Sequence, residues 1–167
     1  MQKITIGTVL FDQAKGAAVV TLVEESGERV LPIFIGIWEG VVISRELNRT
    51  ASPRPLLHDL FCNILQGLQV RLEKVVVNAL SNATYYAQLH LKQQDTAIIA
   101  DARPSDAIAL AVKLQAPIYV VEAVLTAASK RGDFAMEGEA ERKSPTSEED
   151  VQAWLENLRP EDFADPH

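Results

Sequence analysis

The sequence lacks the features that mark several large classes of protein. Its 167 residues include a single cysteine, Cys62, which excludes an internal disulfide and a cysteine-built zinc site and is typical of a reducing compartment. No apolar run approaches the roughly 20 residues that a transmembrane helix needs. The first residues alternate like a strand and have no signal-peptide core. We therefore expect a cytoplasmic protein with no membrane partner.

Several well-known catalytic and nucleotide-binding motifs are missing as well. The chain has no Walker loop, dinucleotide fingerprint, Gly-x-Ser-x-Gly elbow or His-Glu-x-x-His zinc helix. It also has no basic stripe interleaved with aromatic residues, which is typical of proteins that coat single-stranded nucleic acid. The sequence therefore has no evident residues for a hydrolase that uses a nucleophilic serine or cysteine.

The net charge of −7 lies entirely in the last part of the chain. Residues 1–136 contain 13 basic and 13 acidic side chains, whereas residues 137–167 contain 3 basic and 10 acidic ones. A neutral body argues against a general nucleic-acid coat, but it leaves room for a local phosphate site.

Hydrophobic periodicity predicts an α+β fold. Strands are expected at 4–10, 17–24, 29–35, 72–79, 84–92, 97–101 and 117–121, and helices at 37–47, 56–67 and 105–114. A shift of 67 residues lays one part of the chain on the other, so that each half reads strand, strand, strand, helix. We predict a single compact domain made of two pseudo-repeated halves joined by the helix at 56–67. Phe34 and Trp38, which border the first helix, are expected in the core.

The chain divides into a body at residues 1–125 and an acidic C-terminal tail at residues 126–167. Within the tail, Ser147 to Asp150 fits a capping box, and apolar residues follow it at helical spacing until Pro160. We expect a short amphipathic helix there, which would dock on the body or on a second subunit.

Three polar clusters stand at the starts of the predicted helices. They are Glu39, the segment Arg54–Asp59 and the segment Asp101–Asp106. The last two share an arginine, a proline at the opening turn and an acidic residue soon after it. Free N–H groups at such a point attract anions, arginine grips phosphate, and carboxylates with a histidine can hold a hard divalent ion. We expect at least two of the clusters to line one cleft, with Arg54 or Arg103 reaching into it.

A purely structural role explains the same residues. Acidic side chains in a first helical turn are stabilised by the helix dipole, and an arginine beside them can simply pair with them. A lone histidine is more often a hydrogen-bonded structural residue than a ligand. The repetition of arginine, proline and acid in two clusters raises the case for function, but it does not decide between the two interpretations.

The ordered motifs resemble the bifunctional nuclease family. The resemblance covers about residues 1–125 and rests on Leu31–Gly36 with Glu39, Arg54-Pro55-Leu56-Leu57-His58-Asp59-Leu60, Asp101-Ala102-Arg103-Pro104-Ser105-Asp106-Ala107-Ile108-Ala109-Leu110 and Ala116-Pro117-Ile118-Tyr119-Val120. Leu57 replaces the threonine of the family pattern, Gly40 replaces its usual alanine, and residues 126–167 lack the UvrB/UvrC-type motif of the longer members. The resemblance implies a compact α+β fold, a homo-oligomer (a dimer is the first expectation) and nuclease activity on DNA and RNA.

For that activity, the chemistry of the residues favours metal-assisted phosphodiester hydrolysis. The candidates are His58, Asp59, Asp101 and Asp106 for catalysis, Arg54, Arg103 and Ser105 for substrate binding, and Glu39, Asp101 and Asp106 for a Mg²⁺ or Mn²⁺ ion. The alternative is a non-catalytic oligomeric module that binds a small anion or a protein partner. The neutral body, the acidic tail and the missing basic groove favour this alternative.

Overall fold

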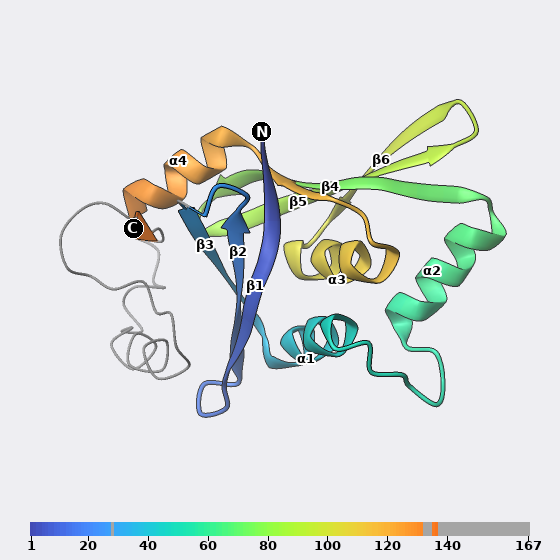
Figure 1. Cartoon of the computed structure of the whole chain (residues 1–167), viewed down its shortest axis with the longest axis horizontal. Helices are drawn as coiled ribbons and strands as arrows, with labels where there is room; N and C mark the ends of the chain where they lie inside the picture. Colours follow the sequence, from blue (N-terminus) through green and yellow to red (C-terminus); the bar gives the residue numbers. More distant parts are fainter. Residues whose placement is uncertain (28, 132–134, 137–167) are drawn as a thin grey trace.

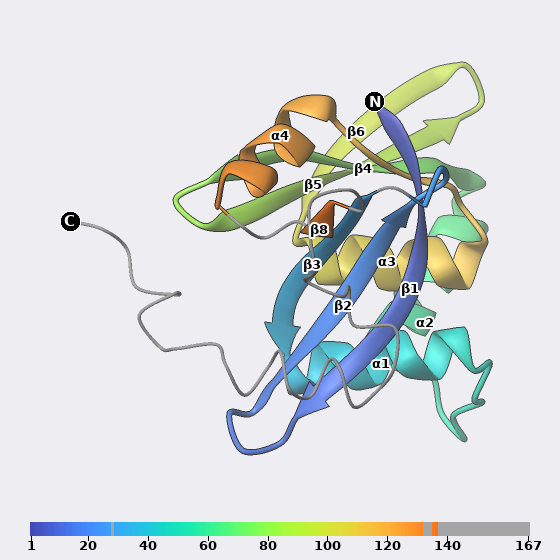
Figure 2. The same cartoon turned by 60° about the vertical axis from the view of Figure 1, so that its left-hand side comes forward.

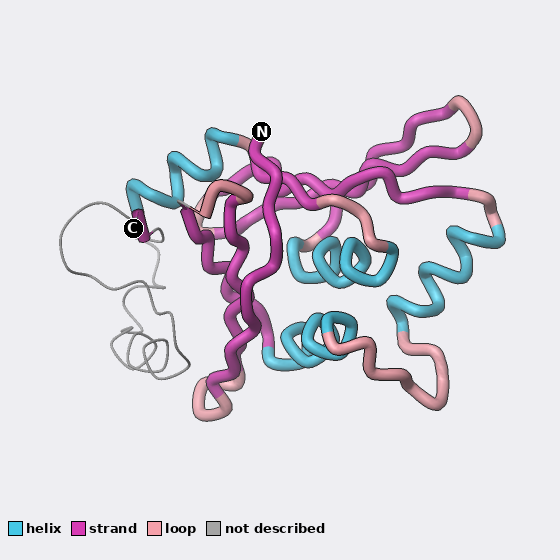
Figure 3. The backbone as a smooth tube through the Cα atoms, viewed as in Figure 1, coloured by secondary structure: helices cyan, strands magenta, loops and turns pink. Residues whose placement is uncertain are grey.

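A computed structural model describes residues 1–27, 29–131 and 135–136. Figure 3 shows that strands and helices together make up most of the described chain. The strands are β1 (Gln2–Asp12), β2 (Ala17–Glu24), β3 (Arg29–Gly36), β4 (Val70–Ser81), β5 (Thr84–Gln93), β6 (Thr96–Ala102), β7 (Ile118–Val120) and β8 (Ala135–Met136). The helices are α1 (Ile37–Leu47), α2 (Leu57–Gly67), α3 (Pro104–Leu114) and α4 (Glu122–Arg131).

All the described strands belong to one mixed sheet with the order β6-β5-β4-β7-β1-β2-β3-β8. Strands β1, β2 and β3 form one antiparallel group, and β4, β5 and β6 form another. Between them, β7 pairs parallel with β4 and antiparallel with β1, so β1 and β4 run in opposite directions. The two groups therefore lie on opposite sides of β7 and run in opposite directions, as they would if a two-fold axis related them. In Figure 1 they cross at a large angle.

The single α+β domain predicted from the sequence is confirmed, and each three-stranded group is followed directly by a helix. The starts of β2, β3 and α1 at residues 17, 29 and 37 recur at 84, 96 and 104 for β5, β6 and α3. The registers differ in detail. Ala17 pairs with Gly36 in the first group, whereas the second ladder begins at Ala87 and Ala102, two residues away from the equivalent pairing. Superposition of the two halves stays a prediction.

Helices α1 and α3 lie side by side in the angle between the two groups of strands, as Figures 1 and 2 show. Branched residues of the sheet pack there against Ile43 of α1 and Ile108 of α3, both of which are fully buried. The close approach of α1 to β2 depends on Gly40. A Cβ atom at residue 40 would lie 2.6 Å from the Cβ of Ala18. The sequence pattern thus brings the starts of α1 and α3 to one end of the helix pair.

Two aromatic residues expected in the core are exposed instead. Trp38 is 76% exposed and Phe34 is 37% exposed. Trp38 precedes Gly40 by two positions, which is about 200° around a helix, so the contact of Gly40 with β2 turns Trp38 toward solvent. Phe34 alternates with Ile33 and Ile35 along β3 and therefore projects from the other face of the sheet. The prediction was wrong because apolar character alone does not tell which face an element buries.

Helix α4 was not expected from the sequence and continues past residue 125. Its Val124, Leu125 and Ala128 side chains join the core. Arg29 holds the start of α4, because its guanidinium donates hydrogen bonds of 2.6 to 3.3 Å to the carboxylates of both Glu24 and Glu122. The amphipathic helix expected in the tail lies outside the described residues. Among the helices described, none is both long and apolar enough to span a membrane.

Candidate functional site

The first turns of α1, α2 and α3 meet through their polar side chains. Glu39 is the third residue of α1, His58 is the second of α2, and Asp106 is the third of α3. Arg103 is the residue that caps α3, and Pro104 follows it in the first turn, where a missing N–H has no helical partner to lose. The helix starts that the sequence singled out are thus neighbours in space, although they are far apart in the chain.

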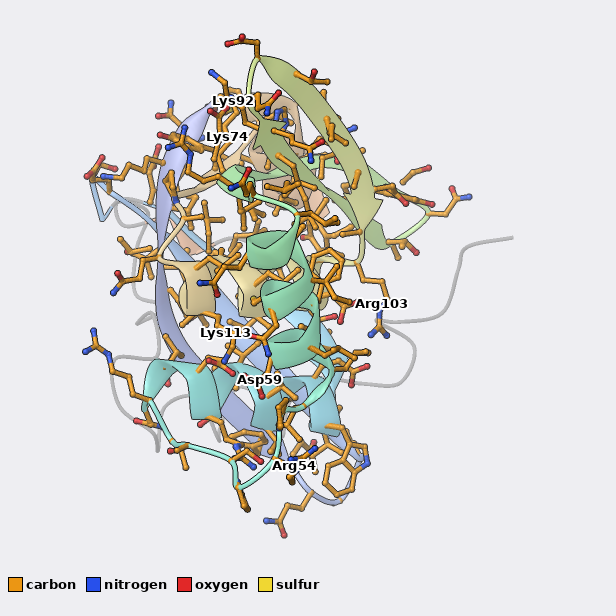
Figure 4. The ribbon with its side chains drawn as sticks, turned by 90° about the vertical axis from the view of Figure 1, so that its right-hand side faces the viewer. Arg54, Asp59, Lys74, Lys92, Arg103 and Lys113 are labelled. Atoms are coloured by element: carbon orange, nitrogen blue, oxygen red, sulfur yellow. The ribbon has the colours of Figure 1, made fainter. Side chains whose placement is uncertain are left out.

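A continuous path of hydrogen bonds joins four of these side chains, which we call the Arg103 network: Glu39, His58, Arg103 and Asp106. Arg103 donates from Nη1 to Glu39 Oε1 at 3.0 Å. It also holds Asp106 with two bonds, from Nε to Oδ2 at 2.8 Å and from Nη2 to Oδ1 at 3.2 Å. On the other side of Asp106, Oδ1 lies 3.2 Å from Nε2 of His58. Figure 4 shows Arg103 reaching from the start of α3 to the surface.

The electrostatics of the network favour an ionised Asp106. Partial burial would raise the pKa of this carboxyl, but the hydrogen bonds and charge of Arg103, aided by His58, outweigh burial and lower the pKa below its ordinary value of 3.8. The pKa of Arg103 is raised in turn, chiefly by its hydrogen bonds to Asp106. At neutral pH Asp106 is therefore a carboxylate held by the guanidinium of Arg103.

The contact with Asp106 fixes which nitrogen of His58 carries a proton. An ionised carboxylate can only accept hydrogen bonds, so Nε2 of His58 must be the donor. In the neutral ring this leaves Nδ1 with a free lone pair, able to accept a proton. Because the His58 side chain is 17% exposed while Arg103 is 65% exposed, the imidazole lies deeper than the guanidinium. A carboxylate that orients a histidine in this way is a common arrangement for proton transfer.

Three other candidate residues are not part of this network. Asp101 lies on β6 opposite Gln88, and its exposed carboxylate makes no side-chain hydrogen bond or ion pair with the described residues. Arg54 is exposed before the start of α2, in the lower part of Figure 4, and makes no such contact with that part of the chain either. Ser105 is buried in the first turn of α3. No group of three or more His, Cys, Asp or Glu side chains in residues 1–27, 29–131 and 135–136 is arranged to hold a metal ion.

Asp59 belongs to a second cluster, with Lys113 and Glu46, and its two carboxylate oxygens contact different partners. Oδ2 accepts the backbone N–H of Leu56 at 2.7 Å and so caps its own helix, whereas Oδ1 is paired with Lys113. Lys113 also donates to Glu46 at 3.0 and 3.1 Å. The lysine thus ties α3 to α1 and α2, and its hydrogen bond is the main cause that lowers the pKa of Asp59. Figure 4 shows Lys113 and Asp59 facing each other between the helices. These contacts support a structural role for Asp59.

Sequence reasoning missed the roles of Glu46 and Lys113, although the repeat contained the signal. Glu46 in α1 and Lys113 in α3 are separated by the same 67 residues that relate the two halves. Trp38, which the sequence analysis placed in the core, is instead a surface residue. It directly precedes Glu39 in α1, and its side chain is 76% exposed.

Comparison with known proteins places these features in a family. The family model for the bifunctional nuclease domain matches residues 20–132. An uncharacterized protein of Mycobacterium tuberculosis (strain H37Rv) is 34% identical over 166 residues, which is 98% of each chain. Bifunctional nuclease 1 of Arabidopsis thaliana is 30% identical over 119 residues, 68% of this chain and 36% of the plant protein.

A second plant relative, Bifunctional nuclease 1 of Oryza sativa subsp. indica, is 25% identical over 114 residues. That match covers 66% of this chain and 34% of the rice protein, so the similarity to plant nucleases concerns the shared domain and not their full length. The domain match includes all four residues of the Arg103 network. The chain belongs to the bifunctional nuclease domain family.

Proposed function

We propose that this protein hydrolyses phosphodiester bonds of DNA and RNA at the Arg103 network. The observation that carries the proposal is the hydrogen-bonded path from Glu39 through Arg103 and Asp106 to His58, built from three separate helix starts. Membership of the bifunctional nuclease domain family supports the same reaction, as do the names of the plant relatives. A path that combines a phosphate-binding side chain with a proton acceptor has the two functions that hydrolysis of a phosphodiester needs.

His58 is the proton-transfer residue in this proposal. With Nε2 held by Asp106, Nδ1 is free to take a proton from the attacking water. The ionised Asp106 then stabilises the imidazolium that forms, in the way that a buried carboxylate supports a catalytic histidine. The same proton can return to the leaving oxygen. Toward His58, Asp106 is therefore a positioning residue, and without it His58 would transfer protons more slowly but still be present.

Arg103 is the phosphate-binding residue. Its planar guanidinium matches two oxygens of a phosphate as well as it matches the carboxylates that hold it now. A bound phosphate would compete with Glu39 and Asp106 for the same N–H groups, and the start of α3 would add its free N–H groups and dipole. Arg54 has no ion pair within the described residues and is the candidate that would bind a second phosphate of the nucleic-acid strand.

A Mg²⁺ or Mn²⁺ ion is part of the proposal. Glu39 and Asp106 are the residues that would hold it, because both carboxylates contact the same guanidinium and are hard oxygen donors. Mg²⁺ commonly uses one or two carboxylates together with water and substrate phosphate, so a third protein ligand is not required. When bound, such an ion supplies Lewis-acid stabilisation of the phosphate. Asp101 was expected as a further ligand of the ion. In the described structure its carboxylate makes no contact with Glu39 or Asp106.

The competing candidate is a non-catalytic module that binds a small anion or a protein partner. The observation that favours it is the pairing of Arg103 with two carboxylates, which already occupy its guanidinium in the described part of the chain. Under this alternative, the four side chains hold the helix starts together and an anion binds without being changed.

An assay with labelled oligonucleotides separates the two candidates. Single-stranded DNA and RNA are incubated with the full chain in Mg²⁺, in Mn²⁺ and in chelator. An Asp101→Ala, Asp106→Ala double variant and an Asp95→Asn control are purified identically, because trace nucleases imitate weak activity. The proposal expects metal-dependent cleavage by wild type and by Asp95→Asn, and its loss in the double variant. Equal cleavage by all three proteins, or none by any, contradicts it.

A further inference from the structure

Strand pairing gathers basic side chains that are spread over residues 71–92 of the sequence. Arg71 of β4 pairs with Lys92 of β5, and Lys74 of β4 pairs with His90 of β5. The side chains of directly opposed residues project from the same face of a sheet. Figure 4 shows Lys74 and Lys92 at the same end of the molecule. Arg71, Lys74 and Lys92 therefore form one group of cations, which we call the β4–β5 basic face.

The β4–β5 basic face lies on the side of β5 that the core does not use. Ala87, Leu89 and Leu91 are buried on one side of this strand, whereas His90 and Lys92 on the other side are partly exposed. The alternation thus places the cations on the solvent side of the sheet.

Helix α4 leaves this part of the sheet open. It contacts β4, but it begins after β7, whose last residue, Val120, pairs with Val77 of β4. Arg71 and Lys74 lie toward the other end of β4, and the Arg71 side chain is 76% exposed. Within the described part of the chain, a ligand can reach the β4–β5 basic face from solvent.

Positive charge exceeds negative charge on this face. Glu73 occupies the bulge of β4 and lies 3.9 Å from Arg71, at the long end of an ion pair. Lys74 and Lys92 form no ion pair with the described residues. Burial lowers the pKa of His90, and the nearby charge of Lys74 lowers it further, against a smaller opposing effect of Glu73. Two ammonium groups thus remain without a carboxylate to neutralise them in the described structure.

Two tyrosines accompany the cations. The ammonium nitrogen of Lys74 lies 6.0 Å from the centre of the Tyr119 ring. Tyr86 is on the same side of β5 as His90 and Lys92, and it is 42% exposed. Cations that follow a phosphate backbone, combined with aromatic rings on which bases stack, are typical of surfaces that bind single-stranded nucleic acid. No such stripe is visible along the sequence, because its members come from three strands.

We infer that the β4–β5 basic face binds the backbone of single-stranded DNA or RNA and leads the strand toward the Arg103 network. Asp101 pairs with Gln88 on this same side of β5, and it precedes Arg103 by two residues. Lys92 is four residues from Gln88 along β5, which is about 13 Å. The inference takes its ligand from the proposed function, but binding at this face does not require hydrolysis.

The acidic tail is the other anionic ligand that the chain offers. Residues 137–167 carry 10 acidic and 3 basic side chains, so the tail would also be attracted to the cations. Tyr86 favours nucleic acid, because an exposed ring can stack on a base as well as border a phosphate path. Occupation by the tail is therefore an outcome that the test must separate.

Fluorescence anisotropy of a labelled single-stranded oligonucleotide tests the inference with the full chain. Affinity is measured in chelator, so that metal-dependent cleavage does not interfere, and at several salt concentrations. The test variant combines Lys74→Gln with Lys92→Gln. The matched control combines Lys15→Gln with Arg49→Gln, which removes the same charge from the turn between β1 and β2 and from the segment that follows α1.

The test variant should bind roughly tenfold more weakly than wild type near physiological salt. The slope of log affinity against log salt should also become shallower by about 1.4, since each phosphate contact with a single strand contributes about 0.7. The control should keep the wild-type slope. Lys74→Arg with Lys92→Arg retains both cations and should retain binding. Thermal unfolding checks that every variant is folded.

A test variant with the affinity and salt slope of the control would overturn the inference. A wild type that does not bind the oligonucleotide would overturn it as well. Tighter binding by the test variant would also do so, because the lysines would then be holding the acidic tail. The proposed function fails separately: a wild type that binds through Lys74 and Lys92 but cleaves nothing in Mg²⁺ or Mn²⁺ supports the binding face and contradicts hydrolysis.

Discussion

Lys113 donates hydrogen bonds to both carboxylate oxygens of Glu46, at 3.0 and 3.1 Å, although the two residues hold the same position in α3 and in α1, 67 residues apart. Equivalent residues of two related units touch where the axis between the units passes. Glu39 and Asp106 are also 67 residues apart and meet on one guanidinium. Asp59 comes from α2, outside the repeated strand, strand, strand, helix unit, and its contact with Lys113 makes the arrangement asymmetric.

Exchange of the two charges at this pair tests the asymmetry. A variant with Glu46→Lys and Lys113→Glu keeps the ion pair but sets a carboxylate at position 113 against Asp59. We expect the free energy of unfolding to fall by about 2 kcal/mol, because partly buried like charges repel strongly. Adding Asp59→Asn should recover most of the loss. Urea unfolding measures all three proteins, and a charge-exchanged variant as stable as wild type would contradict a stabilising role of Asp59.

The response to acid follows from the carboxyls of Asp59 and Asp106, whose pKa values are both lowered from 3.8. Because the unfolded chain binds protons more readily at these groups, their contribution to stability is complete well above pH 3.8 and is lost as the pH falls through their folded pKa values. Urea midpoints should therefore drop steeply below about pH 4. Asp59→Asn should reduce this pH dependence, while Asp95→Asn, in an exposed turn, should not. Parallel curves for both variants would show that Asp59 is not a source of the acid sensitivity.

Gly40 permits the contact between α1 and β2. Gly40→Ala should lower the free energy of unfolding by about 1–3 kcal/mol, since overpacking against the Ala18 side chain exceeds the better helix propensity of alanine. Gly67→Ala is the matched control. A Cβ atom at residue 67 would meet nothing within 4 Å, so this change should be neutral or stabilising. Equal stability of Gly40→Ala and wild type in chemical denaturation would argue against the close contact.

The order and boundaries of the strands and helices were largely predictable, because apolar periodicity is local. Helix α1 was expected at residues 37–47 and is found there, and the apolar side of β5, from Tyr85 to Leu91, is the buried one. What periodicity does not contain is the identity of the face that meets the sheet. Phe34 and Trp38 were expected in the core for that reason. Helix α4 was missed because its apolar residues are few and its stability depends on contacts with β4 and Arg29.

We expected at least two of the three helix starts to come together, since equivalent helix ends of the repeat meet near a common axis. Contacts join Glu39, His58, Arg103 and Asp106, but that these residues line a cleft stays a prediction. The partner of each side chain was not predictable. Whether Asp59 turns toward the network or toward Lys113 depends on the path of α2, which follows from packing of the whole domain and not from the Arg54–Asp59 motif.

Trp38 should contribute to nucleic-acid binding if the Arg103 network is the substrate site. Trp38 directly precedes Glu39, the residue that contacts Arg103, and its indole is exposed. An exposed indole can stack on a base, and such a contact is worth about 1–3 kcal/mol, or roughly 5- to 150-fold in affinity. Trp38→Ala should weaken binding of a labelled single-stranded oligonucleotide by a factor in that range, and Trp38→Phe should restore part of it. Fluorescence anisotropy measures the affinity. Unchanged affinity in Trp38→Ala would place the bases elsewhere.

The most direct test of the account is chemical rescue of His58. His58→Ala should lower the rate of oligonucleotide cleavage by about 10²- to 10⁴-fold, because it removes the proton acceptor that Asp106 orients. Added imidazole should then restore a measurable part of the rate in His58→Ala, and it should have no effect on wild type or on Asp95→Asn. Cleavage by His58→Ala at the wild-type rate would contradict the central claim. A rate lost in His58→Ala that imidazole does not restore at any concentration, in a protein that remains folded, would contradict the assignment of proton transfer to His58.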